Sequence, residues 1–142
     1  MSFETERTIL RPFKPSDADL LLDLYNDPEV RSLAFTDYVA SRLEKWVKEM
    51  VSSQENIPGF LALVEDKETR AFIGHVGLIT ADTKNRNYSF GIALKREWWG
   101  KYIGTEVTQW LVNHAFSKLA VHRITLEVLA NNGRALGVYK RV

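Results

Sequence analysis

The sequence predicts an α+β, or mixed α/β, fold. Three runs of β-forming residues between 59 and 94 are separated by short polar turns, which is typical of a meander of strands. Apolar residues recur at helical spacing in segments before and after these runs. One strand-helix-strand unit follows the meander, and no internal repeat is visible. The predicted order of elements is β-α-α-β-β-β-α-β-α.

The first third of the chain predicts one strand and two helices. Alternating β-formers indicate a strand from Glu6 to Arg11, which ends before Pro12. A capping-box pattern, Ser16 followed by Asp19, predicts a first helix. The same pattern at Ser41 and Glu44 predicts a second, whose apolar face carries Leu43, Trp46, Val47, Met50 and Val51.

The rest of the chain predicts three strands, a helix, a strand and a last helix. The segments "GFLALVED", "AFIGHVGLIT" and "NYSFGIAL" form the three strands. A long helix begins near Ile103, and its apolar face carries Ile103, Val107, Trp110, Leu111 and His114. The segment "HRITLEVLA" then predicts a strand. Asn131 or Asn132 would cap a last helix through Ala135, Leu136 and Tyr139.

Length and composition predict one globular domain over residues 1–142. Apolar residues make up 45% of the chain and charged residues 26%, an ordinary balance. A net charge of +1 provides no overall field for nucleic acid or anionic lipid. No apolar run approaches the roughly 20 residues of a membrane span. We therefore expect a cytoplasmic protein without a nucleic-acid or membrane partner.

The absence of cysteine excludes disulfides, thiolate metal sites and a cysteine nucleophile. The three histidines form no ligand pair, so the sequence predicts no metal site. His114 falls on the apolar face of its helix, which favours a packed side chain over a ligand.

The stretch "REWWGKYIGTE" joins a predicted strand to the long helix. The first amides of that helix lack partners and lie at the positive end of its dipole. Gly100 and Gly104 leave room for a ligand, and Lys95, Arg96 and Lys101 add positive charge, which suits a phosphate or pyrophosphate. The standard phosphate motifs are absent, however. From these residues alone, an anion cradle and a tight turn packed with tryptophan are evenly matched.

Longer segments carry a family resemblance. The segment "GIALKREWWGKYIGTEVTQWLVNHAF" resembles the acetyl-CoA-binding segment of the GNAT superfamily of N-acetyltransferases. "TILRPFKPSDADLLLDLYNDPEVR" and "LEVLANNGRALGVYKRV" resemble its branch of ribosomal-protein N-terminal acetyltransferases, RimJ and RimL. The resemblance implies a mostly antiparallel central sheet flanked by helices, with acetyl-CoA as co-substrate and no metal.

The resemblance also implies a binding site. Backbone groups of the strand at Ile92, Ala93 and Leu94 would hold the pantetheine arm. The pyrophosphate would bind the amides of the loop and first helical turn, Trp99, Gly100, Lys101, Tyr102, Ile103, Gly104 and Thr105. Tyr102 stands where the family usually has a glycine, and it could crowd the diphosphate or contact it through its hydroxyl. Asn132 matches an asparagine that bonds to cofactor or substrate.

Two residues are candidates for catalysis. Tyr139 matches the family's tyrosine acid in "N-x-x-A-x-x-x-Y", whereas helical spacing alone favours a core aromatic. Glu127 is the candidate base, and a solvated strand glutamate is an equal alternative. Without a thiol acyl carrier, direct attack of the amine on the thioester is the simpler route.

The acceptor implied by this branch is a protein N-terminal α-amine. A polyamine or antibiotic amine is the enzymatic alternative, and a non-catalytic acyl-CoA-binding or partner-binding module is the alternative from another class. Family members usually continue with two more strands after "YKRV", whereas this chain ends at Val142. We therefore expect a C-terminally short domain, with a homodimer covering the sheet edge left open.

Overall fold

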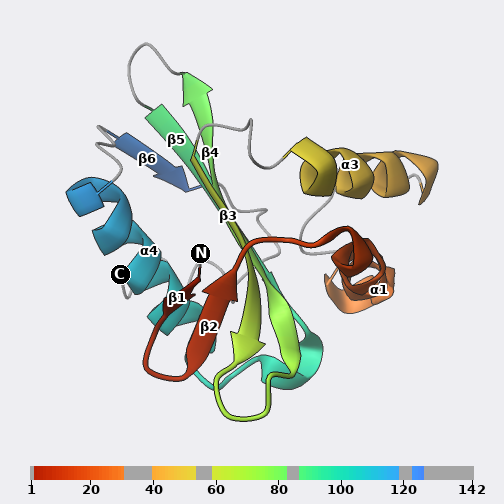
Figure 1. Ribbon diagram of the computed structural model, residues 1–142, viewed down its shortest axis with the longest axis horizontal. Helices are drawn as coiled ribbons and strands as arrows, with labels where there is room; N and C mark the ends of the chain where they lie inside the picture. Colours follow the sequence, from red (N-terminus) through yellow and green to blue (C-terminus); the bar gives the residue numbers. More distant parts are fainter. Residues whose placement is uncertain (1, 31–39, 54–58, 83–86, 119–122, 127–142) are drawn as a thin grey trace.

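The computed structural model describes residues 2–30, 40–53, 59–82, 87–118 and 123–126 (Figure 1). The predicted helices and strands occur in the predicted order as far as these residues extend, but an additional strand, β1, precedes them, and the strand predicted from Glu6 begins at Thr8. In chain order they are β1 (Phe3–Glu4), β2 (Thr8–Arg11), the 3-10 helix η1 (Pro15–Asp17), α1 (Ala18–Asn26), α3 (Ala40–Ser53), β3 (Gly59–Asp66), β4 (Phe72–Asp82), β5 (Asn87–Leu94), the 3-10 helix η3 (Arg96–Trp98), α4 (Ile103–Lys118) and β6 (Arg123–Leu126). The predicted last helix lies outside the described residues.

The six strands within the described residues form one sheet in the order β1-β2-β3-β4-β5-β6. Neighbours from β1 to β5 are antiparallel, which confirms the predicted meander and the mostly antiparallel sheet. Of the strands that the structure describes, β6 alone runs parallel to its neighbour, because α4 carries the chain back across the sheet between β5 and β6. That parallel pairing joins Asn87–Phe90 to Arg123–Leu126. Among the described strands, the end of β5 from Gly91 to Leu94 pairs with β4 alone.

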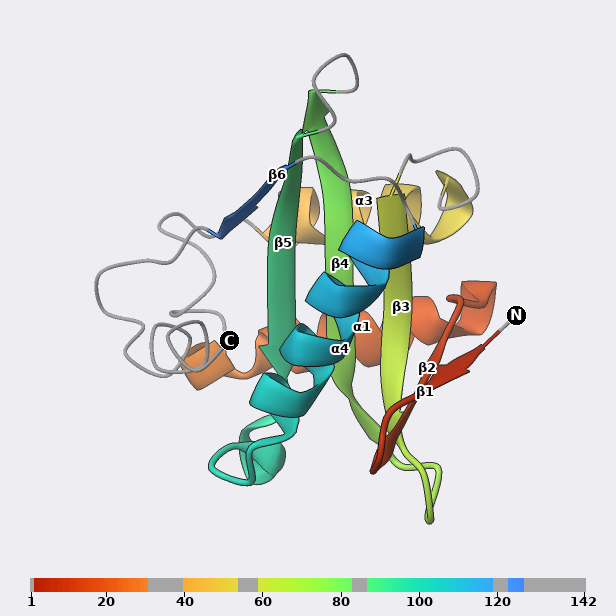
Figure 2. The same cartoon turned by 90° about the vertical axis from the view of Figure 1, so that its left-hand side faces the viewer.

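Helices cover both faces of the sheet (Figure 2). On one face, α4 lies diagonally across the strands and packs into a core whose buried members include Leu10, Val64, Leu78, Val107 and Leu111. On the other, α1 and α3 pack into a second core that includes Phe13, Leu21, Leu24, Val47 and Leu63. Each such side chain contributes about 1.5–3 kcal/mol when fully buried. In the part of the chain that the structure describes, no helix is long and apolar enough to cross a membrane.

The apolar face of α4 is confirmed, with a distinct role for two of its members. Ile103, Val107 and Leu111 are buried against the sheet. Trp110 and His114 are half-buried and stack on each other, with ring centroids 4.7 Å apart and planes 11° apart. Phe3 of β1 packs on both rings, at 5.3 and 4.9 Å. His114 is therefore a packed side chain, as its position in the sequence indicated.

Both predicted capping boxes are wrong. Ser16 lies inside η1 and does not cap a helix; instead the Asp17 carboxylate accepts the Lys14 amide at 2.6 Å. Ser41 lies inside α3, which begins one residue earlier. Glu44 accepts a hydrogen bond from Lys48 at 2.7 Å, one turn further along the helix. Spacing alone does not distinguish a cap from the first turn that follows it, so each pattern located a helix but not its start.

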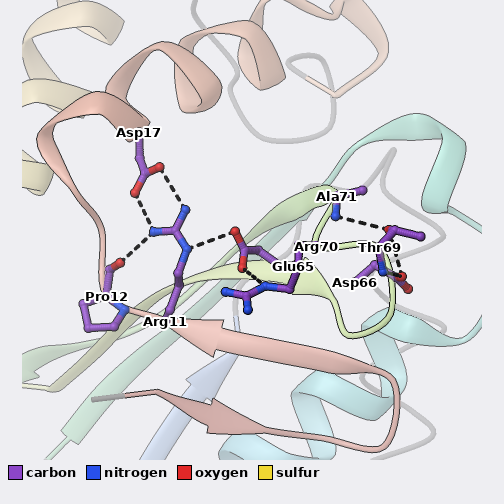
Figure 3. A network of polar contacts seen from close by, with 8 residues as sticks. All are labelled: Arg11, Pro12, Asp17, Glu65, Asp66, Thr69, Arg70 and Ala71. Carbon is purple, nitrogen blue, oxygen red and sulfur yellow. Dashed lines mark hydrogen bonds and ion pairs between the residues drawn. The ribbon is translucent and has the colours of Figure 1, made fainter.

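A buried ionic network fixes the entry to α1 (Figure 3). The Arg11 guanidinium donates to both oxygens of Asp17, at 2.8 and 3.0 Å, and to Glu65 of β3 at 3.0 Å. Burial opposes the charge on Asp17, but hydrogen bonds from Arg11 and the Lys14 amide outweigh it and hold the pKa of that carboxyl below its ordinary value. The network joins β2, β3 and η1, and so orients α1 against the sheet.

Candidate functional site

The loop between β5 and α4 is held at both ends by backbone hydrogen bonds. The Lys95 amide donates to the Ile73 carbonyl of β4 at 2.7 Å, which fixes the point where the chain leaves the sheet. At the far end, the Glu106 amide donates to the Tyr102 carbonyl at 3.1 Å and closes the first turn of α4. Between these points the chain passes through η3 and turns into the start of α4.

Two residues of this loop have left-handed backbone conformations. Gly100 has φ of 75° and Tyr102 has φ of 63°. Glycine adopts this region freely, whereas a side chain makes it costly, by roughly 1–2 kcal/mol. A Cβ added at Gly100 would meet no atom within 4 Å. Glycine is therefore the residue best suited to the backbone conformation at position 100, and the space beside it is open.

The first turn of α4 contains the backbone amides that the sequence analysis predicted to bind an anion. The amides of Ile103, Gly104 and Thr105 precede the first intrahelical donor, so the helix itself supplies them with no acceptor. Gly104 is buried. The Thr105 hydroxyl oxygen is also buried and has no hydrogen-bond partner among the described residues. Amides at a helix start beside an open glycine turn fit a phosphate or diphosphate group.

Trp99 holds the turn rather than offering its amide. That amide donates to the Arg96 carbonyl at 3.1 Å, and its indole donates to the Leu94 carbonyl at 2.9 Å. Two of the predicted contacts, the Trp99 amide and the Leu94 carbonyl, are therefore already engaged within the loop. The remaining predicted cradle runs from Gly100 to Thr105.

The cations around the loop have neighbours of their own. The Lys95 Nζ lies 3.1 Å from Oε1 of Glu97. The Arg96 Nε donates a 3.1 Å hydrogen bond to Oδ2 of Asp27, which follows the last residue of α1. The Lys101 ammonium lies over the Trp98 ring, 5.0 Å from its centroid. These side chains place positive charge around the loop, whereas the groups predicted to bind the ligand belong to the backbone.

The strand residues predicted to hold the pantetheine arm lie where β5 is paired on one side. Ile92 and Leu94 pack toward the α4 core, and Ala93 toward the core of α1 and α3. Among the described residues, the edge of this stretch that faces away from β4 carries no strand. Its backbone groups can therefore bind an extended ligand in the manner of an added strand.

The sequence did not predict a second ionic cluster, which joins the turn between β1 and β2 to the loop and to the first turn of α4. Arg7 donates from its backbone amide and its Nε to the two oxygens of Glu106, at 3.0 and 2.9 Å. Its Nη1 donates to the Lys101 carbonyl at 2.9 Å. The Thr5 hydroxyl adds a 2.5 Å bond to Glu106. Arg7 and Glu106 are 99 residues apart, so no local pattern indicated that they meet.

This cluster keeps Glu106 ionised at the start of α4. Burial opposes its charge, but hydrogen bonds from Thr5 and Arg7 outweigh that effect and lower the pKa of the carboxyl. A carboxylate in the first turn is also favoured by the helix dipole.

A buried polar pair lies on the other face of the sheet. Tyr25 of α1 and Nε2 of His75 share a hydrogen bond of 2.5 Å, and His75 lies opposite Ala93 in the sheet register. Burial lowers the pKa of His75 to about 4 and raises that of Tyr25. Nδ1 of His75 is buried without a hydrogen-bond partner in the described part of the chain. The pattern "AFIGHVGLIT" predicted the strand but not this contact.

The candidate catalytic residues Tyr139 and Glu127, together with Asn132, lie outside the described residues. Their roles stay predictions. Residues 123–126, just before Glu127, form β6 beside the first half of β5.

Comparisons with known proteins agree with this geometry. A family model described as an acetyltransferase (GNAT) domain matches residues 7–142. The uncharacterized N-acetyltransferase p20 of Bacillus licheniformis is 33% identical over 132 residues, which cover 90% of this chain and 73% of that protein.

Two solved structures share the fold. RimL, a ribosomal L7/L12 alpha-N-protein acetyltransferase, superposes with a TM-score of 0.82 at 15% identity, over 99% of this chain and 78% of that one. Spermidine N-acetyltransferase from Vibrio cholerae, in complex with CoA and spermine, gives 0.77 at 23% identity, over 94% and 78%. Because the family model spans nearly the whole chain and a relative is one-third identical, this chain belongs to the GNAT family of acetyltransferases.

Proposed function

We propose that this acetyltransferase transfers the acetyl group of acetyl-CoA to a protein N-terminal α-amine by direct attack. The observation that carries the co-substrate assignment is the cradle from Gly100 to Thr105, where an open left-handed turn meets the first amides of α4, which have no acceptor within the helix. These groups would hold the diphosphate, and the backbone of Ile92 and Ala93 would hold the pantetheine arm. The bound thioester supplies the acetyl group.

In this proposal the acceptor approaches from the side of α1 and α3, since α4 fills the opposite face. The buried and half-buried carboxylates described on that side are each paired with arginine. Asp17 and Glu65 share Arg11, and Asp27 pairs with Arg96. A polyamine carries several positive charges and needs unpaired carboxylates, whereas an N-terminal amine carries one charge. The paired carboxylates therefore favour the N-terminal acceptor.

The ionisation of the acceptor supports the same choice. An α-amine has a pKa of about 7.7–8.0, whereas a lysine-like primary amine has one of about 10.4. Near neutral pH a much larger fraction of an α-amine is already the free nucleophile. We propose that Glu127 removes its remaining proton, directly or through water, and that Tyr139 protonates the leaving thiolate.

We also infer that residues 1–142 act as one domain, that the protein works in the cytoplasm and that two copies pair along the β6 edge. The match of one family model to residues 7–142 supports the single domain. Light scattering after size exclusion tests the homodimer, and a strictly monomeric protein would contradict it.

An acceptor panel tests the function. The chain has no cysteine, so a thiol reagent detects released CoA without background from the enzyme. We expect release with peptides that have a free N-terminus, none with the same peptides N-terminally blocked, and little with spermidine. Faster release with spermidine would overturn the proposed acceptor. No release with any amine, together with CoA binding, would indicate a non-catalytic acyl-CoA-binding module.

A further inference from the structure

We propose that Arg7 is a positioning residue for the diphosphate cradle, acting through Glu106 and the Lys101 carbonyl. This inference rests on the proposed binding of acetyl-CoA at that loop. It assigns to the hairpin of β1 and β2 a part in co-substrate affinity, although Arg7 itself offers its donors to the protein.

The contacts of Arg7 converge on the cradle from behind. Its backbone amide and Nε bind the two oxygens of Glu106, and its Nη1 binds the carbonyl of Lys101. Glu106 belongs to the first turn of α4, and Lys101 lies between the left-handed residues Gly100 and Tyr102. One side chain thus joins both halves of the cradle, the glycine turn and the helix start.

The bond to Lys101 fixes the orientation of a peptide group. In a planar trans peptide the carbonyl of one residue and the amide of the next point in opposite directions. By holding the Lys101 carbonyl at 2.9 Å, Arg7 directs the Tyr102 amide away from itself, on the opposite side of that peptide plane. Lys101 lies between two left-handed residues, and the left-handed conformation of Tyr102 makes this turn costly to form. The hydrogen bond from Arg7 can offset that cost by holding the turn in place.

Arg7 also neutralises a charge that opposes anion binding. Glu106 is an ionised carboxylate in the same helical turn whose amides would bind the diphosphate. Two negative charges close together repel each other, and a nearby cation offsets that repulsion. The guanidinium of Arg7, 2.9 Å from Glu106, supplies that cation. Loss of Arg7 would therefore loosen the turn and expose a like charge to the ligand.

A purely structural role would have a different signature. The Arg7 side chain is 44% exposed, and ion pairs at such positions contribute about 0–1 kcal/mol to stability. The fold should therefore survive its removal, while the geometry of the cradle should not. If loss of Arg7 weakens the binding of only those ligands that contain a diphosphate, Arg7 positions the cradle; an equal loss for all ligands would indicate a purely structural role.

The test compares Arg7→Ala and Arg7→Lys with the parent protein. Calorimetric titration with CoA should show roughly tenfold weaker binding for Arg7→Ala, the size expected for lost charge-assisted hydrogen bonds. Lysine restores the charge but cannot bind Glu106 and Lys101 together, so Arg7→Lys should recover only part of the affinity. Kinetics with acetyl-CoA should show the loss in KM rather than kcat. With S-acetylpantetheine, which lacks the diphosphate, the parent and Arg7→Ala should have equal kcat/KM.

Two further variants sharpen the result. Arg70→Ala is the matched control, because Arg70 is an exposed arginine whose Nε lies 3.0 Å from a glutamate, Glu65, and neither residue belongs to the loop or to α4. It should bind CoA as the parent does. Adding Glu106→Gln to Arg7→Ala removes the uncompensated charge and should bind CoA more tightly than Arg7→Ala alone.

The outcomes separate the two proposals. If the parent binds CoA and Arg7→Ala binds it within twofold, Arg7 has no positioning role and the proposed function stands. An equal loss with S-acetylpantetheine would likewise overturn the positioning role, since general disruption explains it. If the parent itself neither binds CoA nor transfers acetyl groups, the proposed function fails and this inference fails with it.

Discussion

Tyr25 on α1 and His75 on β4 share a 2.5 Å hydrogen bond inside the core that joins two helices to the sheet. The His75 ring is also surrounded by Phe13 and Trp46, with ring centroids 6.4 Å away in each case. Aromatic neighbours of this kind give no counter-charge to an imidazolium. Burial among these rings therefore disfavours the protonated form of His75.

We predict that acid weakens the fold through His75. Its folded pKa is about 4, below the ordinary 6.5, so the unfolded chain binds the proton more tightly. The stability associated with neutral His75 is complete above pH 6.5 and declines as the pH falls toward 4, by on the order of 3 kcal/mol in all. Denaturant unfolding at pH 7 and pH 5 should show this fall.

Substitution isolates the contribution of His75. His75→Gln keeps a hydrogen-bonding group for Tyr25 but does not titrate, so its stability should change less between pH 7 and pH 5 than that of the parent. His114→Gln is the control, because His114 is only half-buried on the other face. An equal pH dependence in parent and His75→Gln would refute this assignment.

We also predict that Arg11 is the most sensitive member of its network. The side chains of Asp17 and Glu65 are 5% and 11% exposed, so Arg11→Met leaves Asp17 without its arginine and leaves Glu65 with the exposed Arg70 as its one remaining arginine partner among the described residues. Breaking such a pair costs about 3–5 kcal/mol. Asp17→Asn should cost less, since Glu65 still balances Arg11. Chemical denaturation measures both.

The pH dependence provides a check. Because the folded pKa of Asp17 lies below the ordinary 3.8, its stabilisation is present above that pH and is lost as the pH falls further. The defect of Arg11→Met should therefore shrink in strong acid. Arg70→Ala removes the 60% exposed arginine from the same glutamate and should cost less than about 1 kcal/mol. Equal losses in Arg11→Met and Arg70→Ala would contradict the network's role.

The sequence predicted what depends on local spacing. Ile103, Val107 and Leu111 mark one face of a helix whatever surrounds them, so α4 and its buried face could be predicted. The glycine turn and the helix start could also be predicted, because they are adjacent in the chain; that they bind an anion stays a prediction. Arg7 with Glu106, and Tyr25 with His75, depend on the path of the chain between distant segments. Each of these pairs consists of residues that are ordinary in their own local context.

The candidate catalytic residues give a kinetic prediction. Tyr139→Phe removes the proton donor to the leaving thiolate, so kcat should fall while acetyl-CoA affinity changes little. Glu127→Gln removes the base, so the acid limb of the pH-rate profile should disappear. Steady-state kinetics from pH 6 to 9 measures both. Unchanged kinetics in the two variants would contradict both roles and would favour the alternatives, a core aromatic at Tyr139 and a solvated glutamate at Glu127.

Tyr102 and Gly100 give opposite predictions at neighbouring positions. Both have positive φ, but only Gly100 is suited to it. Gly100→Ala should weaken CoA binding and cost about 1 kcal/mol of stability, although its Cβ has room, because the cost lies in the backbone. Tyr102→Gly relieves the backbone strain at position 102, since glycine adopts a positive φ freely. It also removes a 63% exposed ring from the cradle. Its CoA affinity should equal or exceed that of the parent.

The result for Tyr102 decides how its side chain acts. If the ring crowds the diphosphate, Tyr102→Gly tightens CoA binding, and Tyr102→Phe leaves it unchanged. If the hydroxyl contacts the ligand, both substitutions weaken it. Tyr102→Val serves as the steric control, because a β-branched residue is least tolerant of positive φ and should distort the turn. Titration with CoA and thermal unfolding of all three variants separate lost contacts from lost backbone geometry, since only the valine should lower the melting temperature appreciably.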